Sequence, residues 1–283
     1  MKEKPFSKYQ ILANAVMIIW TLAIILPFIL LFMSSITDEN TLVANGYSFF
    51  PKKFSLASYS YIIKSGGQIL KAYGVSIGVT VVGTLLNVLL SALMAYPLSV
   101  KNLPGRNVMM FFVFFTMLFN GGIVPSYIMW TGTFHIKDTI FAQLLPNFLL
   151  SAWNVMMIRT YFTTSIPDGL YEAAEIDGAS QFTIFWKIVL PLGKPILVTM
   201  GTFAGLAYWN DWTNGLYYIV KNTGLYNVQN LLNQMVQNIQ FLTQSSNSNV
   251  TAAASTIPAT GIQMAIAFVA ILPIMLIFPS FQK

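Results

Sequence analysis

Long apolar runs restrict the fold of this chain more than any other feature. From about Ile11 to Met33 nearly every residue is apolar, which is long enough for a helix to cross the roughly 30 Å hydrocarbon layer of a membrane. Of the 283 residues, 55% are hydrophobic and only 8% are charged, compared with about 25% charged in soluble domains. A soluble fold could not bury so much apolar surface, so lipid must form part of the solvent.

Further stretches match the first in length and apolar character, and we predict an all-α integral membrane protein with six transmembrane helices. The expected spans are 11–35, 73–97, 107–130, 139–162, 189–212 and 260–280. The first run is longer than the core of about 7 to 15 residues in a cleaved signal peptide, so we expect a retained helix. Glycines four residues apart, Gly74 with Gly78 and Gly201 with Gly205, would let neighbouring helices approach closely.

The spans divide the chain into alternating inner and outer segments. The expected parts are a cytoplasmic N-terminus (1–10), a first helix (11–36), an extracytoplasmic loop (37–72), a five-helix core (73–280) and a C-terminus (281–283). Within the core, we expect 163–195 to be a cytoplasmic loop and 213–259 to be an extracytoplasmic loop. With the N-terminus inside, nine of the 15 Lys and Arg residues lie on the cytoplasmic side and six outside, as the positive-inside rule favours.

Several kinds of site are excluded by the residues that the chain lacks. The net charge of +6 comes from scattered basic residues without aromatic interleaving, so no nucleic-acid partner is expected. The absence of Cys excludes disulfides and thiolate metal sites. His135 is the only histidine and has no partner at metal-ligand spacing, so we expect no metal site. Gly193-Lys194 lacks the other residues of a phosphate-binding loop, and we expect no ATP site.

The most specific segment is a short polar stretch at 165–180. Ser165 can cap a helix, Pro167 suits a first helical turn, and Asp168 completes a capping box. Gly178 is placed to end the helix. The predicted helix has about three turns at the 3.6-residue repeat, which is too short to cross a bilayer.

The two faces of this predicted helix differ in character. At 100° per residue, Asp168, Glu172 and Glu175 lie on one face. The opposite side carries Ile166, Leu170, Ala173 and Ala174, with Asp177 among them. A helix on the lipid surface is one interpretation, but such helices usually carry Lys and Arg, because the cytoplasmic leaflet is anionic. A protein partner with basic groups explains the acidic face better. An acid–base pair of Glu172 and Glu175 would need a pocket, so docking is favoured over catalysis.

A second helix is predicted from Gln181 onward, broken by Pro191 and Pro195 around Gly193-Lys194. It leads directly into the fifth span. A force on the loop would therefore reach a transmembrane helix, which is the geometry that a transmission element needs.

These residues resemble the EAA loop of binding-protein-dependent ABC importer permeases, whose fold is called MetI-like. The motif positions are Glu172-Ala173-Ala174, Asp177-Gly178-Ala179 and Leu190-Pro191. The resemblance covers nearly the whole chain, because three later segments are similar to carbohydrate permeases of the MalG and LplC type. These segments are Tyr208-Trp-Asn-Asp-Trp212, Ile262-Gln-Met-Ala265 and Phe278-Pro-x-x-Phe-Gln-Lys283.

The resemblance implies a function and a set of partners. The loop would dock in a groove of a separate ATPase through Glu172, Ala173, Ala174, Asp177, Gly178, Ala179, Leu190 and Pro191. The expected partners are a homologous permease as a heterodimer, two cytosolic ATPase subunits, an extracytoplasmic solute-binding protein, a carbohydrate and the lipid bilayer. This chain would be no enzyme and hold no cofactor, since ATP and Mg would bind to the ATPase.

A sugar path needs amides or hydroxyls beside aromatic rings. The candidates at membrane depth are Asn87, Asn120, Asn147, Asn154, Trp209, Asn210, Asp211 and Trp212. The alternative is that the asparagines bridge helices and the tryptophans belong to the interfacial belt. The resemblance also implies that 213–259 faces the binding protein, with a solvated linker as the alternative.

Two other functions compete with ATP-driven import. A secondary transporter driven by an ion gradient usually places carboxylates or His within its spans, whereas Asp211 here lies at the end of one. A membrane-embedded enzyme would need a His–carboxylate or metal constellation, which the sequence lacks.

Overall fold

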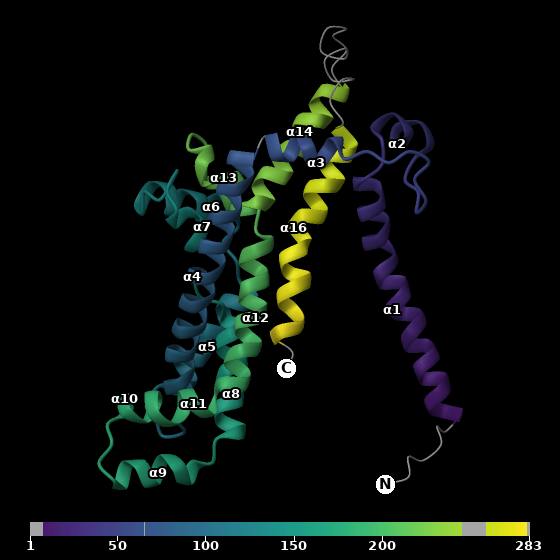
Figure 1. Cartoon of the computed structure of the whole chain (residues 1–283). Coiled ribbons are helices and arrows are strands. Elements are labelled where there is room, and N and C mark those ends of the chain that lie inside the picture. The colour runs from purple at the N-terminus through teal and green to yellow at the C-terminus, as the bar shows by residue number, and fades with distance from the viewer. Residues whose placement is uncertain (1–7, 65, 245–258, 282–283) are drawn as a thin grey trace. The chain divides into compact units, whose positions relative to one another are not determined.

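The computed structural model describes residues 8–64, 66–244 and 259–281. Every regular element in these ranges is a helix (Figure 1), and the extended backbone forms only an isolated bridge between Thr37 and Phe54. The prediction of an all-helical protein is confirmed. Contacts divide the chain into two units, which we describe separately: unit 1, Met1–Ile69 with Leu232–Lys283, and unit 2, Leu70–Leu231.

Unit 2 contains most of the helices. Its elements are α4 (Gly66–Ser99), which begins in unit 1, α5 (Arg106–Leu118), α6 (Ile123–Ile128), π-helical η1 (Met129–Thr133), α7 (Phe141–Leu144), α8 (Ala152–Ser165), α9 (Asp168–Ile176), α10 (Gln181–Ile184), π-helical η2 (Phe185–Val189), α11 (Leu190–Leu192), α12 (Lys194–Asn210), α13 (Thr213–Tyr218), 3-10 helical η3 (Thr223–Leu225) and the start of α14 (Val228–Gln244). Within this unit, α9 lies at one end, and α6, α7 and α13 lie at the other (Figure 1).

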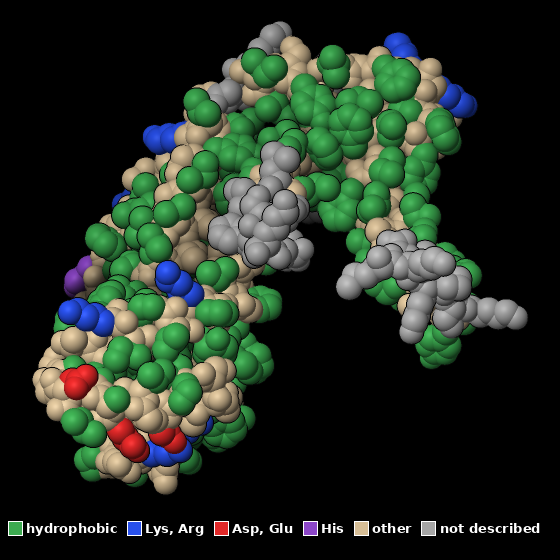
Figure 2. Space-filling view, turned by 60° about the horizontal axis from the view of Figure 1, so that its bottom comes forward, with side chains coloured by type: hydrophobic (Ala, Val, Ile, Leu, Met, Phe, Trp, Pro, Cys, Tyr) green, Lys and Arg blue, Asp and Glu red, His purple; other side chains and the backbone are tan. Residues whose placement is uncertain are grey.

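Two described helices are long and apolar enough to cross a membrane, over Tyr9–Ser35 and Gly67–Ser99. Two bent helix pairs would raise the number to four if each pair is one span, and Thr260–Met275 is apolar but shorter. Hydrophobic side chains cover much of the face drawn in Figure 2, as expected where lipid replaces water. The count of six spans stays a prediction.

The expected span at 107–130 is interrupted by a bend. Helix α5 ends at Leu118, and α6 with η1 continues at an angle of 110°. The break falls on Asn120-Gly121-Gly122, where the Asn120 Oδ1 accepts the Gly122 N–H at 2.8 Å and Gly122 has φ +86°. A side-chain-capped turn followed by a glycine in the left-handed region ends the helix, whatever the apolar character on either side.

The expected span at 139–162 is wrong in extent. Helix α7 has only four residues, and α8 starts at Ala152. Between them the chain passes through Pro146 and Asn147, which has φ +67°. This non-helical stretch stays satisfied because side chains of neighbouring helices bond its carbonyls, as Asn87 does with Phe148 O at 2.5 Å.

Close packing of α4 and α12 uses one of the two predicted glycine pairs. A Cβ on Gly201 would lie 3.4 Å from Val88, and one on Gly205 would lie 3.3 Å from the Thr84 hydroxyl. The pair Gly74–Gly78 has no atom within 4 Å of either Cβ position. Only the fifth-span pair therefore brings two helices of unit 2 together.

Unit 1 contains α1 (Lys8–Ser35), α2 (Glu39–Asn45), α3 (Ala57–Lys64) and α16 (Ala259–Phe281). Helix α1 is exposed along most of its length and packs against α16 near its C-terminal end, where the Phe32 and Phe268 rings lie 4.9 Å apart. The segment predicted as a structured loop, 37–72, contains α2, α3 and the start of α4.

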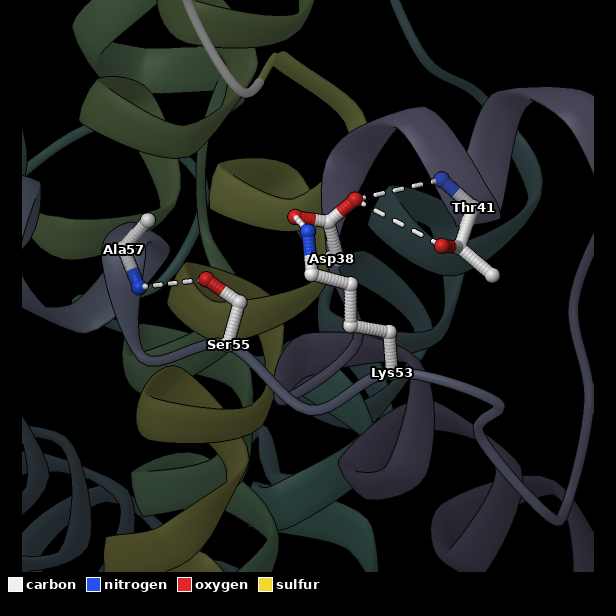
Figure 3. Close-up of polar contacts among 5 residues, drawn as sticks. All are labelled: Asp38, Thr41, Lys53, Ser55 and Ala57. Atoms are coloured by element: carbon white, nitrogen blue, oxygen red, sulfur yellow. Dashed lines mark hydrogen bonds and ion pairs between the residues drawn. The ribbon is translucent and has the colours of Figure 1, made fainter.

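Polar contacts fix the segment between α1 and α3 (Figure 3). Asp38 caps α2 by accepting the Thr41 N–H and hydroxyl at 3.4 Å each, and its other carboxylate oxygen lies 3.4 Å from the Lys53 ammonium. The Ser55 hydroxyl accepts the Ala57 N–H at 3.2 Å where α3 begins. Each helix start therefore has a side-chain acceptor for an otherwise unsatisfied donor.

The N-terminus of α16 is held by a carboxylate that lies far away in sequence. Both oxygens of Glu39 accept backbone N–H groups, from Thr260 and from Gly261, at 2.8 Å each. Gly261 packs tightly, since a Cβ there would lie 2.5 Å from the Ser58 hydroxyl. The start of α16 is thus clamped between α2 and α3.

Part of the 213–259 segment is folded, so a wholly solvated linker is wrong. Helix α13, η3 and α14 lie within 213–244, and Tyr218, Ile219 and Tyr226 belong to a buried cluster. The remainder of the segment at 245–258 lies outside the described residues, as do 1–7 and 282–283 of the two predicted termini.

Candidate functional site

The predicted short helix is present as α9. The helix begins at Asp168, and Pro167 is its N-cap residue. The prediction that Ser165 caps the helix is wrong, because Ser165 is the last residue of α8. Gly178 ends the helix as predicted, with φ +76°, and the Ala179 N–H returns to the Ala174 carbonyl at 2.9 Å. A residue with a Cβ would be strained at this position, because the left-handed region favours glycine.

Helix α9 contacts its own unit through a narrow face. Tyr171 is half-buried and Ala174 is 8% exposed. The sequence interpretation placed Ala174 on the face turned to a partner, and this is wrong. The other residues of the helix are exposed, including the acidic Asp168, Glu172 and Glu175.

Apolar side chains are exposed beside these acids. Ile176 is 87% exposed, and Leu170 is 42% exposed. Phe182 on α10 is also largely exposed, at 68%. Large apolar side chains rimmed by charges typically mark a protein interaction surface. The acidic side chains visible in Figure 2 gather at one end of the face drawn there.

Two of the acids make local contacts. Asp168 forms an ion pair with Lys101 in the turn between α4 and α5, with both side chains more than half exposed, so its contribution to stability is small. The Glu175 carboxylate accepts the Gln181 side-chain N–H at 2.8 Å. Burial raises the pKa of the Tyr171 hydroxyl, so it stays neutral.

The second arm of the loop, α10 with η2, buries one face in the core of unit 2. Ile184, Phe185 and Val189 are at most 2% exposed. The Phe185 ring lies 5.4 Å from that of Tyr96 on α4, whose hydroxyl donates to Gln181 at 2.5 Å. The loop is therefore fixed to α4 by both packing and a hydrogen bond.

The arm joins α12 through a bend of 77° at Gly193. A Cβ at this glycine would lie 2.6 Å from the ring of Phe162, which is fully buried on α8. The predicted break is thus present at this glycine. Leu190 packs in the core and Pro191 is exposed.

Two arginines at this end were not singled out from the sequence. The guanidinium groups of Arg106 and Arg159 both donate to the Leu98 carbonyl, at 3.0 and 3.2 Å. This carbonyl belongs to the last turn of α4, where helix carbonyls lack partners and the helix dipole favours cations. Both arginines flank expected spans, and this position in the sequence could have indicated a role at a helix end.

The predicted path residues Asn87 and Asn154 contact each other. The Asn154 amide donates to Asn87 Oδ1 at 2.7 Å, and both residues are buried. With the bond from Asn87 to Phe148 O, this pair connects α4, α8 and the intervening loop. This geometry matches the alternative interpretation, in which the asparagines bridge helices instead of contacting a sugar.

The other path candidates lie apart from this pair. Asn120 caps the bend after α5, and the exposed Asn147 donates to Asn214 at 3.3 Å. At the end of α12, Trp209 and Asp211 are buried, with 8% and 4% exposure. Their neighbours Asn210 and Trp212 are exposed.

A buried amide network connects α7, α13 and α14, and the sequence interpretation missed it. Gln143 donates to Asn230 at 3.3 Å, and Asn227 donates to the Asp211 carbonyl at 2.6 Å. Asn214 donates to the Pro146 carbonyl at 3.1 Å. The sequence signal was the repeated Asn in 214–230, which was interpreted as loop composition.

Comparison with known protein families identifies one family that matches most of the chain. Residues 73–283, about three quarters of the chain, match the family described as "Binding-protein-dependent transport system inner membrane component". The match includes α9, the bend at Gly193 and α12.

Individual relatives extend the similarity to the whole chain. Protein LplC of Bacillus subtilis (strain 168) is 36% identical over 92% of this chain and 85% of its own length. The polygalacturonan/rhamnogalacturonan transport system permease protein YtcP of the same organism is 34% identical over 97% and 94%. In a solved bacterial ABC transporter involved in import of the acidic polysaccharide alginate, one chain matches with a TM-score of 0.81 and 26% identity over 99% of both chains.

Proposed function

The chain belongs to the family of inner membrane components of binding-protein-dependent transport systems, and we propose that it is the permease subunit of an ATP-driven importer for a carbohydrate. The carbohydrate assignment is supported by YtcP and by the alginate transporter, whose names refer to polysaccharides. An oligosaccharide is the proposed form of the cargo.

One observation carries the proposal: an exposed acidic helix is joined rigidly to a helix of the spanning core. Helix α9 presents Glu172 and Ile176 outward, while Phe185 and Val189 anchor the following arm. At Gly193 the backbone of the arm packs closely against the Phe162 ring of α8. A displacement of α9 would therefore be passed to α12 rather than absorbed locally.

The motor would be a separate protein, because this chain carries no phosphate-binding loop. Two cytosolic ATPase subunits would bind ATP and Mg, and one would hold α9 through basic groups opposite the acidic face. Closure of the ATPases would pull on α9, and the resulting shift of α12 would expose the central path to alternate sides of the membrane.

The remaining partners follow from this arrangement. A homologous permease would complete the path as a heterodimer, and a solute-binding protein would deliver the sugar from outside. Helix α9 would lie in the cytoplasm, with both chain termini on that side. The end of unit 2 with α6, α7 and α13 would then face the exterior.

Of the candidate sugar-contacting residues, we retain those at the end of α12. Asn87 and Asn154 bond each other, whereas the side chains of Asn210 and Trp212 are exposed. An amide beside an indole ring offers both a polar partner and an apolar surface for a sugar.

Charge reversal on α9 tests the coupling role. We expect Glu172→Lys to abolish ATP-driven uptake by the assembled transporter in vesicles while the protein still inserts and assembles, because this side chain is exposed. Gly178→Asp should have the same effect by distorting the helix end. The control is Asn102→Lys, an exposed site in the adjacent α4–α5 turn. Normal uptake by both loop variants would remove the coupling role.

Composition of the intact complex tests the partners and the cargo. Purification from the native membrane should yield a second permease, an ATPase and a solute-binding protein, and mass spectrometry should detect a bound glycan. A complex without an ATPase, or with a non-carbohydrate cargo, would contradict the corresponding part of the proposal.

A further inference from the structure

The loop after α8 has two arms that carry opposite charge. The first arm, 168–177, contains four acidic residues and neither Lys nor Arg. The second arm, 181–195, contains Lys187 and Lys194 and neither Asp nor Glu. We call 181–195, which includes α10, η2 and α11, the basic arm. The function proposed above gives the acidic arm a partner but leaves the exposed face of the basic arm without one.

The basic arm runs nearly at a right angle to α12. This helix has 17 residues, which gives a length of about 26 Å and is near the lower limit for crossing the hydrocarbon layer. The bend between Gln181–Leu192 and α12 is 77°, and Figure 1 shows α10 and α11 crosswise to α12 at its N-terminal end. With α12 crossing the membrane, the basic arm lies along the membrane surface at the level of the lipid headgroups.

Only one face of the basic arm is covered by its own unit. Ile184 and Val189 are fully buried on that face, whereas Trp186 is 43% exposed and Leu192 is 46% exposed. The Trp186 ring packs edge to face with Phe182, with ring centres 5.9 Å apart. The indole N–H has no acceptor among the described residues. The uncovered face thus presents an apolar ring with a free polar donor, as tryptophans do at membrane interfaces.

The two lysines of the basic arm are exposed and have no acidic partner. No described carboxylate lies within 4.0 Å of the ammonium of Lys187 or Lys194. Lys187 directly follows Trp186, and Lys194 is the first residue of α12. Helices that lie on a membrane combine Trp with Lys or Arg in this way, because the cytoplasmic leaflet is anionic. The acids of the first arm would be repelled by the same leaflet.

We propose that the basic arm docks on anionic phospholipids of the cytoplasmic leaflet, with Trp186 at the boundary between headgroups and acyl chains and with Lys187 and Lys194 against the phosphates. The proposal uses the function proposed above only for the identity of the protein that binds α9. Lipid contact would hold the bend at Gly193 at a fixed depth. A displacement of α9 would then turn α12 instead of lifting the arm from the membrane.

Photocrosslinking in the intact transporter tests which molecule covers this face. The complex is placed in nanodiscs that contain equal amounts of phosphatidylglycerol and phosphatidylcholine with identical acyl chains. In the variant Trp186→p-benzoylphenylalanine, mass spectrometry of the irradiated chain should show a phospholipid adduct. The matched control is Ile176→p-benzoylphenylalanine on α9, where the side chain is 87% exposed. This control should crosslink to the ATPase instead of to lipid.

The two lysines should determine which lipid is captured at position 186. Phosphatidylglycerol adducts should exceed phosphatidylcholine adducts about fivefold, the ratio expected for one lysine beside an anionic headgroup. Adding Lys187→Gln and Lys194→Gln should lower this ratio to about one, because the attraction is lost. Adding Lys187→Arg and Lys194→Arg, which keeps both charges, should preserve the ratio.

Different results would overturn the lipid docking and the proposed function. A protein adduct in place of the lipid adduct at position 186, or no adduct there, overturns the docking on lipid. So does a lipid ratio that is the same in the Lys→Gln variant and in the unchanged protein. A control at position 176 that captures no ATPase would overturn the proposed function, whereas a phosphatidylglycerol adduct at position 186 would still support the lipid contact.

Discussion

At the scale of single residues, the contacts of a residue, and not its type, determine how strongly a substitution should affect stability. Among the glycines, Gly193 and Gly78 have ordinary helical or near-helical backbone, yet a Cβ at Gly193 would strike the Phe162 ring and one at Gly78 would meet nothing within 4 Å. Asp138 is similar, because three backbone donors converge on an otherwise ordinary surface carboxylate.

Adding a methyl group at Gly193 should destabilise the protein. We expect Gly193→Ala to lower the free energy of unfolding by about 1–3 kcal/mol, as overpacking of a filled core does, because the ring and the Val189 carbonyl both crowd the new atom. Thermal unfolding in detergent measures the change. Gly78→Ala is the control and should cause no loss; an equal loss in both variants would show that the contact with Phe162 is not the cause.

Acid should weaken the hold of the Asp138 carboxylate on the 220–222 backbone. The backbone N–H groups hold the pKa of Asp138 below its ordinary value. Since the folded-state pKa is lowered, the stabilisation is present above the unfolded-state value of about 3.9 and is lost as the pH falls through the folded-state value. Asp138→Asn should therefore lower the Tm at pH 6, and the difference from the unchanged protein should shrink at pH 3. A difference that is the same at both pH values would contradict this.

At the scale of elements, helix ends are satisfied by residues from elsewhere in the chain. The arginines of α5 and α8 bond the last turn of α4, and Glu39 of α2 bonds the first donors of α16. Such bonds replace the water that a helix end would otherwise contact, and they fix where each long apolar helix begins or ends. These bonds also connect helices whose contact cannot be predicted from hydropathy.

Removing the Glu39 carboxylate should loosen the start of α16. We expect Glu39→Ala to cost about 1–2 kcal/mol of unfolding free energy, the usual effect of deleting an N-cap acceptor. Hydrogen exchange at 260–264 and thermal unfolding both report the change. Asn40→Ala, an exposed neighbour, serves as the control. Unaltered exchange at 260–264 in the Glu39 variant would show that the carboxylate does not hold the helix end.

At the scale of the whole molecule, the described carboxylates outside Asp211 fall into two groups: those on or directly after α9 and those that bind the protein's own backbone donors. The acids of α9 are exposed, whereas the carboxylates of Asp38, Glu39 and Asp138 are all directed to the protein's own donors. In the function proposed above, both the energy and the cargo would come from other proteins. Such an importer would not need ionisable relays in the middle of its spans.

Energy source separates an ATP-driven importer from a secondary transporter. In sealed vesicles with the full complex and its binding protein, uptake should require ATP on the α9 side and should persist when ion gradients are collapsed. The measurement is accumulation of the glycan that co-purifies with the complex. Uptake by this chain alone, without ATP and dependent on an ion gradient, would support the secondary transporter.

The sequence alone determined the membrane class, the all-helical fold and the position of the α9 loop. Apolar length and helix-ending residues such as Gly178 act locally, so they can be interpreted without knowing the fold. The family motif around Glu172 was likewise local.

The tertiary structure decided what depends on residues distant in sequence. It broke the expected span at Asn120, turned Ala174 inward, and paired Asn87 with Asn154. It also gave Glu39 its role at α16. A buried amide or carboxylate is satisfied by whichever donor the fold brings within about 3 Å. That partner has no signature in the local sequence, because the distance is set by packing of the whole unit.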